Sequence, residues 1–584
     1  MDFKSMLHAI SRPRKNAVSY DLSTDFKYTG LQEYPRPQLQ RKSYINLNGK
    51  WDYRILSGQG QVICSGPIEV PFSPETSLSG TVQHVLLPEE TLEYTKVFTL
   101  EKVKKSKNLI LHFGAVDQVA HVSVNGISLG THEGGYTSFS FDITEYVVGG
   151  SNEIKVKVRD YTDKVGYARG KQCLDPHGMW YTAQSGIWQT VWMEWVPKAY
   201  VTNMRITPDI NRNRVDFIFK VSEMKGQIVV SSSNQDLIKR YSVDKISDDH
   251  IYAHIELDKY KLWTPEEPNI YFVNVEYGKD SFSTYFTMRH FGVDVDENGI
   301  PRLTLNHKPY FMNGVLDQGY YPESLMTPPS DDAMIFDIET IKSLGFNMIR
   351  KHCKLEPMRW YFHCDRIGMI VWQDIVNGGT EYNMNMICNI PTLVRPFGNT
   401  KDKNKIFLKY TGRNTEKSKE LWRMECRDIM KQLYSVPCIG QWCLFNEGWG
   451  QFDAKGNLEF AKKFDTTRPF DAASGWFHEG CGDVYSEHLY FEELRVKKGA
   501  RPYVISEYGG PSLKVGGHVK KDFLYGYKRF SQPKDLQAYY DKLMAKIKSL
   551  KEEGLAGAVY TQATDVEEEV NGLITYDRKV QKLY

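Results

Sequence analysis

Two glutamates carry the clearest signal for chemistry in this chain. Glu447 lies in Leu444-Phe-Asn-Glu-Gly-Trp449 and Glu507 in Val504-Ile-Ser-Glu-Tyr-Gly509, so each glutamate ends an apolar run. A pair of carboxyl groups can hydrolyse a glycoside, because one protonates the departing oxygen while the other attacks the anomeric carbon or activates water. The two tasks need different pKa values, which burial and repulsion can raise and hydrogen bonds from Arg or Tyr can lower. Arg350 and Tyr490 are our candidates for those hydrogen bonds.

The second half of the chain has the rhythm needed to bring such residues together. After about Gly292, short apolar runs alternate with amphipathic segments, a pattern typical of parallel strands joined by helices. One such helix carries Met334, Ile338 and Ile341 at i, i+4 and i+7 and ends near Gly345. The apolar runs, which we predict to be strands, are residues 310–315, 346–350, 369–372, 439–445, 470–473, 483–485, 503–506 and 556–560. Eight strands with helices between them predict a TIM (β/α)8 barrel over residues 291–584.

Barrel enzymes place their catalytic groups at the carboxyl ends of the strands. Many of the residues that follow the predicted strands are polar or aromatic. We therefore expect these residues to gather on one face of the barrel: Asp317, Arg350, His352, Asp374, Asn446, Glu447, Ser474, Trp476, His488, Tyr490, Glu507, Thr561 and Gln562.

The first half of the chain has the period-2 alternation and the turn residues of antiparallel β-structure. After an N-terminal extension, residues 1–43, the pattern predicts a jelly roll over 44–198 and an immunoglobulin-like β-sandwich over 199–290. Neither segment has a nucleophile motif, a phosphate loop or metal-ligand spacing, so we expect the chemistry to lie elsewhere. Trp180, Tyr181 and Trp188 crowd one loop-rich stretch, as core aromatics or as a binding platform.

Composition excludes several classes of protein. The 584 residues are enough for three or four domains, and 74 Lys+Arg against 72 Asp+Glu leave no net field for nucleic acid or for a membrane surface. No apolar run is long enough to span a membrane, and Met1–Tyr20 lacks the apolar core of a secretory signal. The nine cysteines are an odd number without CxxC pairs, so we expect a reduced, cytoplasmic protein.

Several motifs together resemble the family 2 glycoside hydrolases, the group of β-galactosidases, β-glucuronidases and β-mannosidases. In the first segment they resemble the family's sugar-binding jelly roll, and Leu262-Trp-Thr-Pro-Glu-Glu-Pro268 resembles the signature that closes its immunoglobulin-like domain. The jelly-roll motifs are Leu47-Asn-Gly-Lys-Trp51, Val70-Pro-Phe72 and Ser185-Gly-Ile-Trp-Gln189, and those of barrel strands 2 and 3 are Gly345-Phe-Asn-Met-Ile-Arg350 and Cys364-Asp-Arg-Ile-Gly368.

The resemblance implies a role for each matching residue. Asn446-Glu447 matches the family's Asn-Glu pair, which makes Glu447 the acid/base and gives Asn446 a hydrogen bond to the sugar 2-hydroxyl. Glu507 matches the nucleophile of a retaining, exo-acting β-glycoside hydrolase that needs no cofactor. Trp476 and Trp449 could offer apolar faces to the sugar or belong to the barrel packing.

The sugar is predicted from charge. By resemblance, glucuronidases use an Asn-x-Lys motif to hold the sugar carboxylate, whereas the matching stretch here, residues 567–578, starts with three glutamates and contains no lysine. Such acids would repel a uronic acid if they lined the site, although we expect Glu567 to Glu569 to face solvent. A neutral sugar, with β-galactoside as the plainest choice, is therefore favoured. Asp317 and Asp374 are candidates to bind its hydroxyls, and Arg350 and His352 either contact it or brace the barrel.

Other functions stay open at this point. The substrate could be a β-mannoside, a β-glucuronide or an arabinopyranoside, and the chain could be an inactive carbohydrate-binding protein. A phosphate-binding barrel enzyme is disfavoured because no Gly-rich phosphate loop follows strand 7 or 8. His352-Cys353 and His363-Cys364 lack zinc-site spacing, so we expect no metal. The long segments 377–419 and 511–534 could form a rim that limits the aglycone, solvated insertions or contacts in a homo-oligomer.

Overall fold

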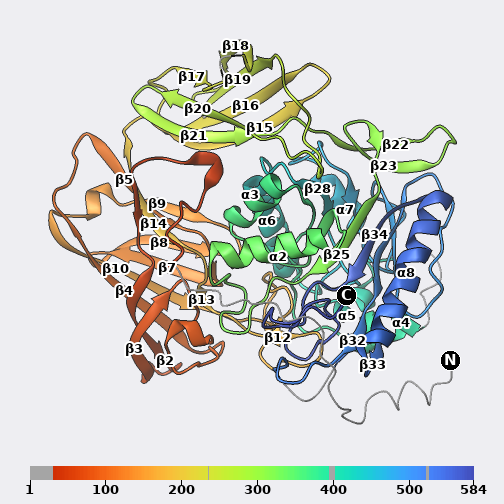
Figure 1. Ribbon diagram of the computed structural model, residues 1–584. Helices are drawn as coiled ribbons and strands as arrows, with labels where there is room; N and C mark the ends of the chain where they lie inside the picture. Colours follow the sequence, from red (N-terminus) through yellow and green to blue (C-terminus); the bar gives the residue numbers. More distant parts are fainter. Residues whose placement is uncertain (1–29, 235, 394–400, 521–524, 584) are drawn as a thin grey trace.

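The computed structural model describes residues 30–583 except 235, 394–400 and 521–524. Most of the predicted N-terminal extension, including Met1–Tyr20, lies outside the described residues, as do parts of the two long segments. The chain forms two antiparallel β regions and a barrel (Figure 1). Among the described residues, no helix has both the length and the apolar character needed to cross a bilayer.

The first β region is the predicted jelly roll. A six-stranded sheet of order β3-β2-β4-β10-β7-β8 and a four-stranded sheet of order β1-β14-β5-β9 share one apolar core. The Asn125-Gly126 turn joins β7 to β8 with positive φ at both residues, as a type I′ hairpin requires. The strands are β1 Tyr44–Asn46, β2 Gly49–Leu56, β3 Val62–Val70, β4 Thr91–Leu100, β5 Lys107–Phe113, β7 Val119–Val124, β8 Ile127–Glu133, β9 Phe139–Asp142, β10 Gly150–Arg159 and β14 Val191–Pro197.

The second β region is a sandwich of seven antiparallel strands, as in immunoglobulin-like folds. Its sheets have the orders β15-β16-β19-β18 and β17-β20-β21, and alternate residues of both sheets enclose a second core. The strands are β15 Val201–Asp209, β16 Arg214–Val221, β17 Ile228–Ser231, β18 Ile238–Lys245, β19 His250–Leu257, β20 Tyr271–Tyr277 and β21 Asp280–Phe286.

The remaining chain forms the TIM barrel. The eight predicted strands are all present, and they pair in parallel in the order β29-β28-β27-β26-β25-β34-β31-β30, a nearly closed sheet. They are β25 Met312–Asp317, β26 Met348–Lys351, β27 Ile370–Asp374, β28 Ile439–Cys443, β29 Phe470–Asp471, β30 Tyr485–Leu489, β31 Tyr503–Gly509 and β34 Leu555–Thr561. A short sheet, β22 Phe291–Val295, β23 Pro301–Leu305 and β24 Lys308–Pro309, precedes them.

The helices follow the prediction less completely. The amphipathic stretch that contains Met334 and Ile341 is α2, as its periodicity predicts. Within the described residues, however, no helix separates β29 from β30 or β30 from β31, because these connections run as irregular loops. The principal barrel helices are α2 Asp331–Ser343, α3 Met358–Ile367, α6 Glu416–Leu433, α7 Ala454–Ala461 and α8 Pro533–Glu553.

The two long segments contain some regular structure. The first holds α4 Ile390–Leu393, α5 Lys405–Tyr410 and the start of α6, and the second holds the short parallel pair of β32 Pro511–Leu513 and β33 Lys528–Phe530. The nine cysteines, all within the described residues, form no disulfide.

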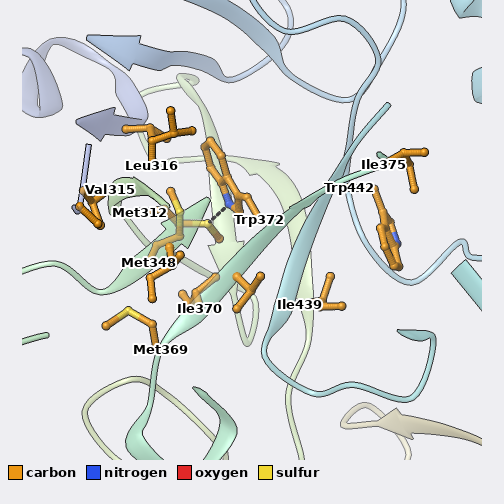
Figure 2. Packing of buried hydrophobic residues seen from close by; sticks show 14 of the residues in the cluster. Met312, Val315, Leu316, Met348, Met369, Ile370, Trp372, Ile375, Ile439 and Trp442 are labelled. Atoms are coloured by element: carbon orange, nitrogen blue, oxygen red, sulfur yellow. Dashed lines mark hydrogen bonds between the residues drawn. The ribbon is translucent and has the colours of Figure 1, made fainter. Parts of the chain in front are cut away.

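Large apolar side chains of the barrel strands pack against one another in the core. Trp372, on β27, is buried, and its indole N–H donates to the Met312 sulfur at 3.0 Å (Figure 2). A Cβ on Gly557 of β34 would lie 3.1 Å from the Trp372 ring, which is tighter than an ordinary van der Waals contact, so a larger residue here would press on the ring.

Trp263 joins the sandwich to the barrel. Its fully buried indole N–H donates to the Asp365 carbonyl oxygen of α3 at 2.8 Å, and its ring meets Phe291 edge-on. We expect Trp263→Ala to lower the free energy of unfolding by about 3–5 kcal/mol, because it leaves a large cavity between two parts of the chain. Phe272→Ala, at a position 55% exposed on β20, is the matched control and should change stability by less than about 0.5 kcal/mol. Equal effects on the denaturant midpoint would contradict this role for Trp263.

Candidate active site

A buried arginine ties together four strand ends. Arg350, on β26, donates from Nε to Asp374 Oδ1 at 3.0 Å and from Nη2 to Asp374 Oδ2 at 3.2 Å. The same guanidinium donates to Asn446 Oδ1 at 2.8 Å and to Glu507 Oε1 at 3.0 Å. Burial opposes its charge, but the neighbouring Asp374, Cys443 and Glu507 outweigh burial and raise the pKa of Arg350 well above its ordinary value. A permanent cation therefore sits at the centre of the polar face.

Glu507 is held at both carboxylate oxygens. Arg350 donates to Oε1, and the Tyr490 hydroxyl donates to Oε2. Tyr490 also lies 3.1 Å from the Thr561 hydroxyl. Burial raises the pKa of Glu507, while His488 and Arg350 act in the opposite direction. Both predicted supporting residues thus contact Glu507, and they fix the orientation of its carboxylate.

Glu447 follows β28 in an uncommon backbone conformation. Its φ is +50°, a left-handed value that costs free energy in a residue with a side chain and that often marks functional positions. Its backbone N–H donates to the Ser474 carbonyl oxygen at 2.9 Å, which holds the turn in place. Burial raises the pKa of Glu447 from 4.5 to about 7, although Lys171 and Arg350 lower it. This carboxyl group is therefore able to keep a proton near neutral pH.

One imidazole bridges the two glutamates. His488 Nδ1 lies 2.8 Å from Glu447 Oε1, and His488 Nε2 lies 3.4 Å from Glu507 Oε1 and 3.1 Å from the Ser474 hydroxyl. Burial lowers the pKa of His488 to about 3, so the ring is neutral and carries one N–H. One carboxylate oxygen from each glutamate and one His488 ring nitrogen all lie within 4.8 Å of one another. The carboxyl groups are thus close enough to act on the same atom.

The structure brings most of the other predicted residues to this cluster. His352 Nδ1 lies 2.7 Å from Asp374 Oδ2, and the Trp449 ring packs 5.7 Å from the His352 ring. The Trp476 ring meets His488 edge-on at 5.4 Å, and its indole N–H donates to the Ile387 carbonyl oxygen at 3.1 Å. Asp374 and Trp449 therefore position the His352 ring, and Trp476 positions the His488 ring.

Asp317 and Gln562 make different contacts. Lys351 Nζ lies 2.5 Å from Asp317 Oδ2, and the Gly319 N–H donates to Asp317 Oδ1 at 3.0 Å. The Gln562 side chain accepts a hydrogen bond from Gln318 and donates one to Asn571. The carboxylate of Asp317 is therefore engaged by Lys351 and a backbone amide and makes no described contact with Glu447 or Glu507.

The three consecutive glutamates after β34 do not face solvent, so that expectation was wrong. Glu567, Glu568 and Glu569 are all buried. Their partners come from the jelly roll and from the segment after β31. Glu567 binds Lys520 at 2.9 Å, Glu568 accepts from the Gly178 N–H at 2.8 Å, and Glu569 accepts from the Tyr181 hydroxyl.

A jelly-roll lysine also reaches the site, which was not expected from the sequence. The Lys171 ammonium lies 3.7 Å from Glu569 Oε2 and over the rings of Tyr181 and Trp449. Its charge partly offsets the rise that burial causes in the pKa of Glu447, and it adds to the fall that burial causes in the pKa of His352. The sequence offers little signal for Lys171 beyond its place nine residues before Trp180, since a single basic residue in a loop is usually solvated.

Two groups of buried side chains have donors close enough to bind a metal: His352, Cys353 and Asp374, and Glu447, His488 and Glu507. Arg350 donates to Asp374 in the first group and to Glu507 in the second. A cation in either group would lie beside this fixed positive charge. The arrangement therefore suits proton transfer and nucleophilic attack better than metal coordination.

The raised pKa of Glu447 predicts a pH-dependent cost to stability. A carboxyl group whose pKa is higher in the folded than in the unfolded chain lowers the free energy of unfolding as pH rises from the unfolded to the folded value. Removing this group should therefore stabilise the protein above pH 7 and leave it unchanged near pH 4. We expect the free energy of unfolding of Glu447→Gln to exceed that of the parent protein by about 3 kcal/mol at pH 8, as measured by denaturant unfolding. Glu552→Gln, on the exposed face of α8, is the matched control, and a pH-independent effect of Glu447→Gln would contradict the assignment.

Comparison with known proteins places the chain in a family. Residues 66–203 match the family model described as "Glycosyl hydrolase 2 galactose-binding domain-like", and residues 297–583 match "Glycosyl hydrolases family 2, TIM barrel domain". A β-galactosidase of Thermoanaerobacter pseudethanolicus is 26% identical over 71% of this chain and 53% of its own length. A putative β-glucuronidase of Formosa agariphila is 27% identical over 48% of this chain and 34% of its own length. The chain thus spans about half, or less, of the length of these relatives.

Solved structures show the same fold along almost the whole chain. A β-glucuronidase of Dictyoglomus thermophilum superposes with a TM-score of 0.70 at 17% identity and covers 94% of this chain and 96% of its own. A Bifidobacterium dentium β-glucuronidase complexed with coumarin-3-O-glucuronide gives a TM-score of 0.71, also at 17% identity, and covers 93% of this chain and 96% of its own. With two family models matching the jelly roll and the barrel, the chain belongs to glycoside hydrolase family 2.

Proposed function

We propose that the protein hydrolyses β-glycosides with retention of configuration, with Glu507 as the nucleophile and Glu447 as the acid/base. The observation that carries this proposal is the pair of buried carboxyl groups bridged by His488, with oxygen atoms within 4.8 Å of each other. Retaining glycosidases need carboxyl groups about 5–5.5 Å apart, whereas inverting enzymes need a wider gap to admit water. The close spacing favours direct attack by a carboxylate.

The first chemical step uses the difference between the two carboxyl environments. Glu507 attacks the anomeric carbon while Arg350 and Tyr490 hold its two oxygens. Glu447, whose pKa is about 7, keeps the proton that the departing oxygen needs. The bond from the anomeric carbon to the aglycone breaks, and an ester forms between the sugar and Glu507.

The second step reverses the proton flow. Glu447, now a carboxylate, removes a proton from the attacking water, and the ester on Glu507 is hydrolysed. His488 fits both states because it is neutral: Nδ1 accepts from protonated Glu447, or donates to ionised Glu447 after the ring changes tautomer. In the first tautomer, Nε2–H donates to the Ser474 oxygen, whose own hydrogen is donated to Ser506 Oγ at 2.8 Å; in the second, the Ser474 hydroxyl turns to donate to Nε2.

Asn446 supplies a contact to the sugar. Its Oδ1 accepts from Arg350, which sets the orientation of the amide, and its buried Nδ2 finds no acceptor among the described residues. A buried donor without a partner is costly unless a ligand satisfies it. This supports the proposal that Asn446 binds the sugar 2-hydroxyl.

A neutral sugar, with β-galactoside first, remains the favoured substrate class. The stretch 567–578 contains no lysine to hold a carboxylate, and its three glutamates are buried against the jelly roll. The relatives carry both names, β-galactosidase and putative β-glucuronidase, so β-glucuronide is the second candidate. Charge at the site favours the first, because a uronate would approach Glu569.

A panel of nitrophenyl β-glycosides tests the activity and the sugar together. We expect measurable hydrolysis of the galactoside and a loss of about 10⁴-fold in Glu507→Gln, because the nucleophile is gone. Glu447→Gln should lose about 10²–10⁴-fold on leaving groups that need protonation and far less on dinitrophenyl glycosides. Equal losses on both leaving groups would contradict the acid/base role of Glu447, and hydrolysis of the glucuronide alone would replace the favoured sugar.

The pH profile of kcat/KM should be bell-shaped. Activity falls above about pH 7 because Glu447 loses its proton, and it falls at low pH because Glu507 gains one. On a dinitrophenyl glycoside, Glu447→Gln should lose the fall at high pH while keeping the fall at low pH. A fall at high pH that survives in this variant would show that another group limits the rate.

A further inference from the structure

Lys171 is placed by backbone pairing within the jelly-roll loop. It directly precedes β11 Gln172–Cys173, which pairs in parallel with β12 Tyr181–Thr182. The Tyr181 N–H donates to the Lys171 carbonyl oxygen at 2.9 Å. The two side chains therefore leave neighbouring strands side by side, and the Lys171 ammonium lies 5.4 Å from the centre of the Tyr181 ring.

The loop is also fixed to the barrel. Ala168 pairs with Gly378, and the Gly170 N–H donates to the Asn377 carbonyl oxygen at 3.1 Å. The Asn377 amide returns a hydrogen bond to the Gly170 carbonyl oxygen at 3.1 Å. A Cβ on Gly170 would lie 2.6 Å from the Cys353 carbonyl oxygen, so only glycine permits this approach. The position of Lys171 is thus determined by the barrel as much as by its own sheet.

The Lys171 ammonium has no hydrogen-bond partner among the described residues, and its side chain is largely enclosed. Its side chain is 6% exposed, and among the described residues its nearest carboxylate oxygen, Glu569 Oε2, is 3.7 Å away. The Trp449 indole N–H, on the ring beneath the ammonium, likewise has no acceptor among these residues. An ammonium has three donors, so in a largely enclosed place it favours a ligand that offers acceptors. Two unsatisfied donors at one place point to a ligand with acceptor oxygens.

Glu569 supplies the complementary acceptor. Tyr181 donates to its Oε2, and Asn571 donates more weakly to its Oε1 at 3.4 Å. A carboxylate has about four acceptor positions, so capacity remains. Glu569 and Lys171 both act on the pKa of Glu447, in opposite directions, which places the pair beside the proposed acid/base. One oxygen can lie about 2.8 Å from each of two atoms 3.7 Å apart.

We propose that Lys171 and Glu569 clamp one hydroxyl group of the sugar, Lys171 donating to the hydroxyl oxygen and Glu569 accepting its hydrogen. This inference rests on the proposed glycosidase function and sharpens its substrate class to sugars that carry a neutral hydroxyl at the clamped position. A carboxylate there would gain Lys171 but would face Glu569. The jelly roll thus takes part in recognition of the sugar, while the proposed chemistry stays on the barrel.

The test couples a protein change to a substrate change. On the best nitrophenyl glycoside, Lys171→Met and Glu569→Gln should each lower kcat/KM about 10- to 100-fold. One of the 3-, 4- and 6-deoxy analogues should lose a similar factor with the parent enzyme, and on that analogue Lys171→Met should cost less than about 3-fold. Lys164→Met, on the same loop but about half exposed, is the control and should leave every rate unchanged. A change in folding alone would lower all rates equally.

Two results would overturn the clamp. The first is an equal loss for Lys171→Met on the parent glycoside and on every deoxy analogue. The second is a parent enzyme that prefers the glucuronide and loses that preference in Lys171→Met, since Lys171 would then bind a carboxylate. Calorimetric binding of galactose and its deoxy analogues gives a readout without turnover: if nothing is hydrolysed but the coupling appears in affinity, the catalytic proposal fails and the clamp stands. Absence of both turnover and binding overturns both.

Discussion

The buried guanidinium of Arg350 is the interaction on which the site depends. Removing such a group from water is unfavourable, and only closely placed acceptors offset the loss. Asp374, Asn446 and Glu507 provide these acceptors from the ends of three other strands. Because a guanidinium is planar and its donors are fixed, it sets the orientation of all three side chains together. The guanidinium thus fixes the Glu507 carboxylate and the Asn446 side chain, which directly precedes Glu447.

The same arrangement separates the behaviour of the two glutamates. Both carboxyl groups are buried, and burial raises both pKa values. Glu507 receives a cation and a tyrosine hydroxyl, whereas the direct side-chain partner of Glu447 is His488, which burial keeps neutral. Within the proposed mechanism, the proton therefore resides on Glu447. Two chemically identical side chains acquire different roles from their neighbours alone.

Local periodicity was sufficient to predict the barrel strands, because each strand is a short run of apolar residues that are buried in the fold. Strand ends then identified Arg350, Asn446, Glu447, Tyr490 and Glu507, which the structure brings into contact. The sequence could not show that Glu567 to Glu569 are buried, since their partners Gly178 and Tyr181 lie almost 400 residues earlier. For the same reason Lys171 carried no signal. The missing helices around β30 reflect connections that have too little apolar periodicity to bury a helical face.

Within the proposed function, the contacts between the jelly roll and the barrel separate recognition of the sugar from the chemistry. Arg413 donates to the Gly166 carbonyl oxygen at 2.8 Å, and Glu425 accepts from the Ala168 N–H at 2.8 Å. These bonds hold the loop through its backbone and do not involve the Lys171 side chain. Residue 171 can therefore change without disturbing the bonds that hold Glu447 and Glu507. The two carboxyl groups come from strand ends, whereas Lys171 comes from a loop that is docked on the barrel. Within the proposed function, a change at residue 171 therefore alters which sugar binds and leaves the carboxyl pair in place.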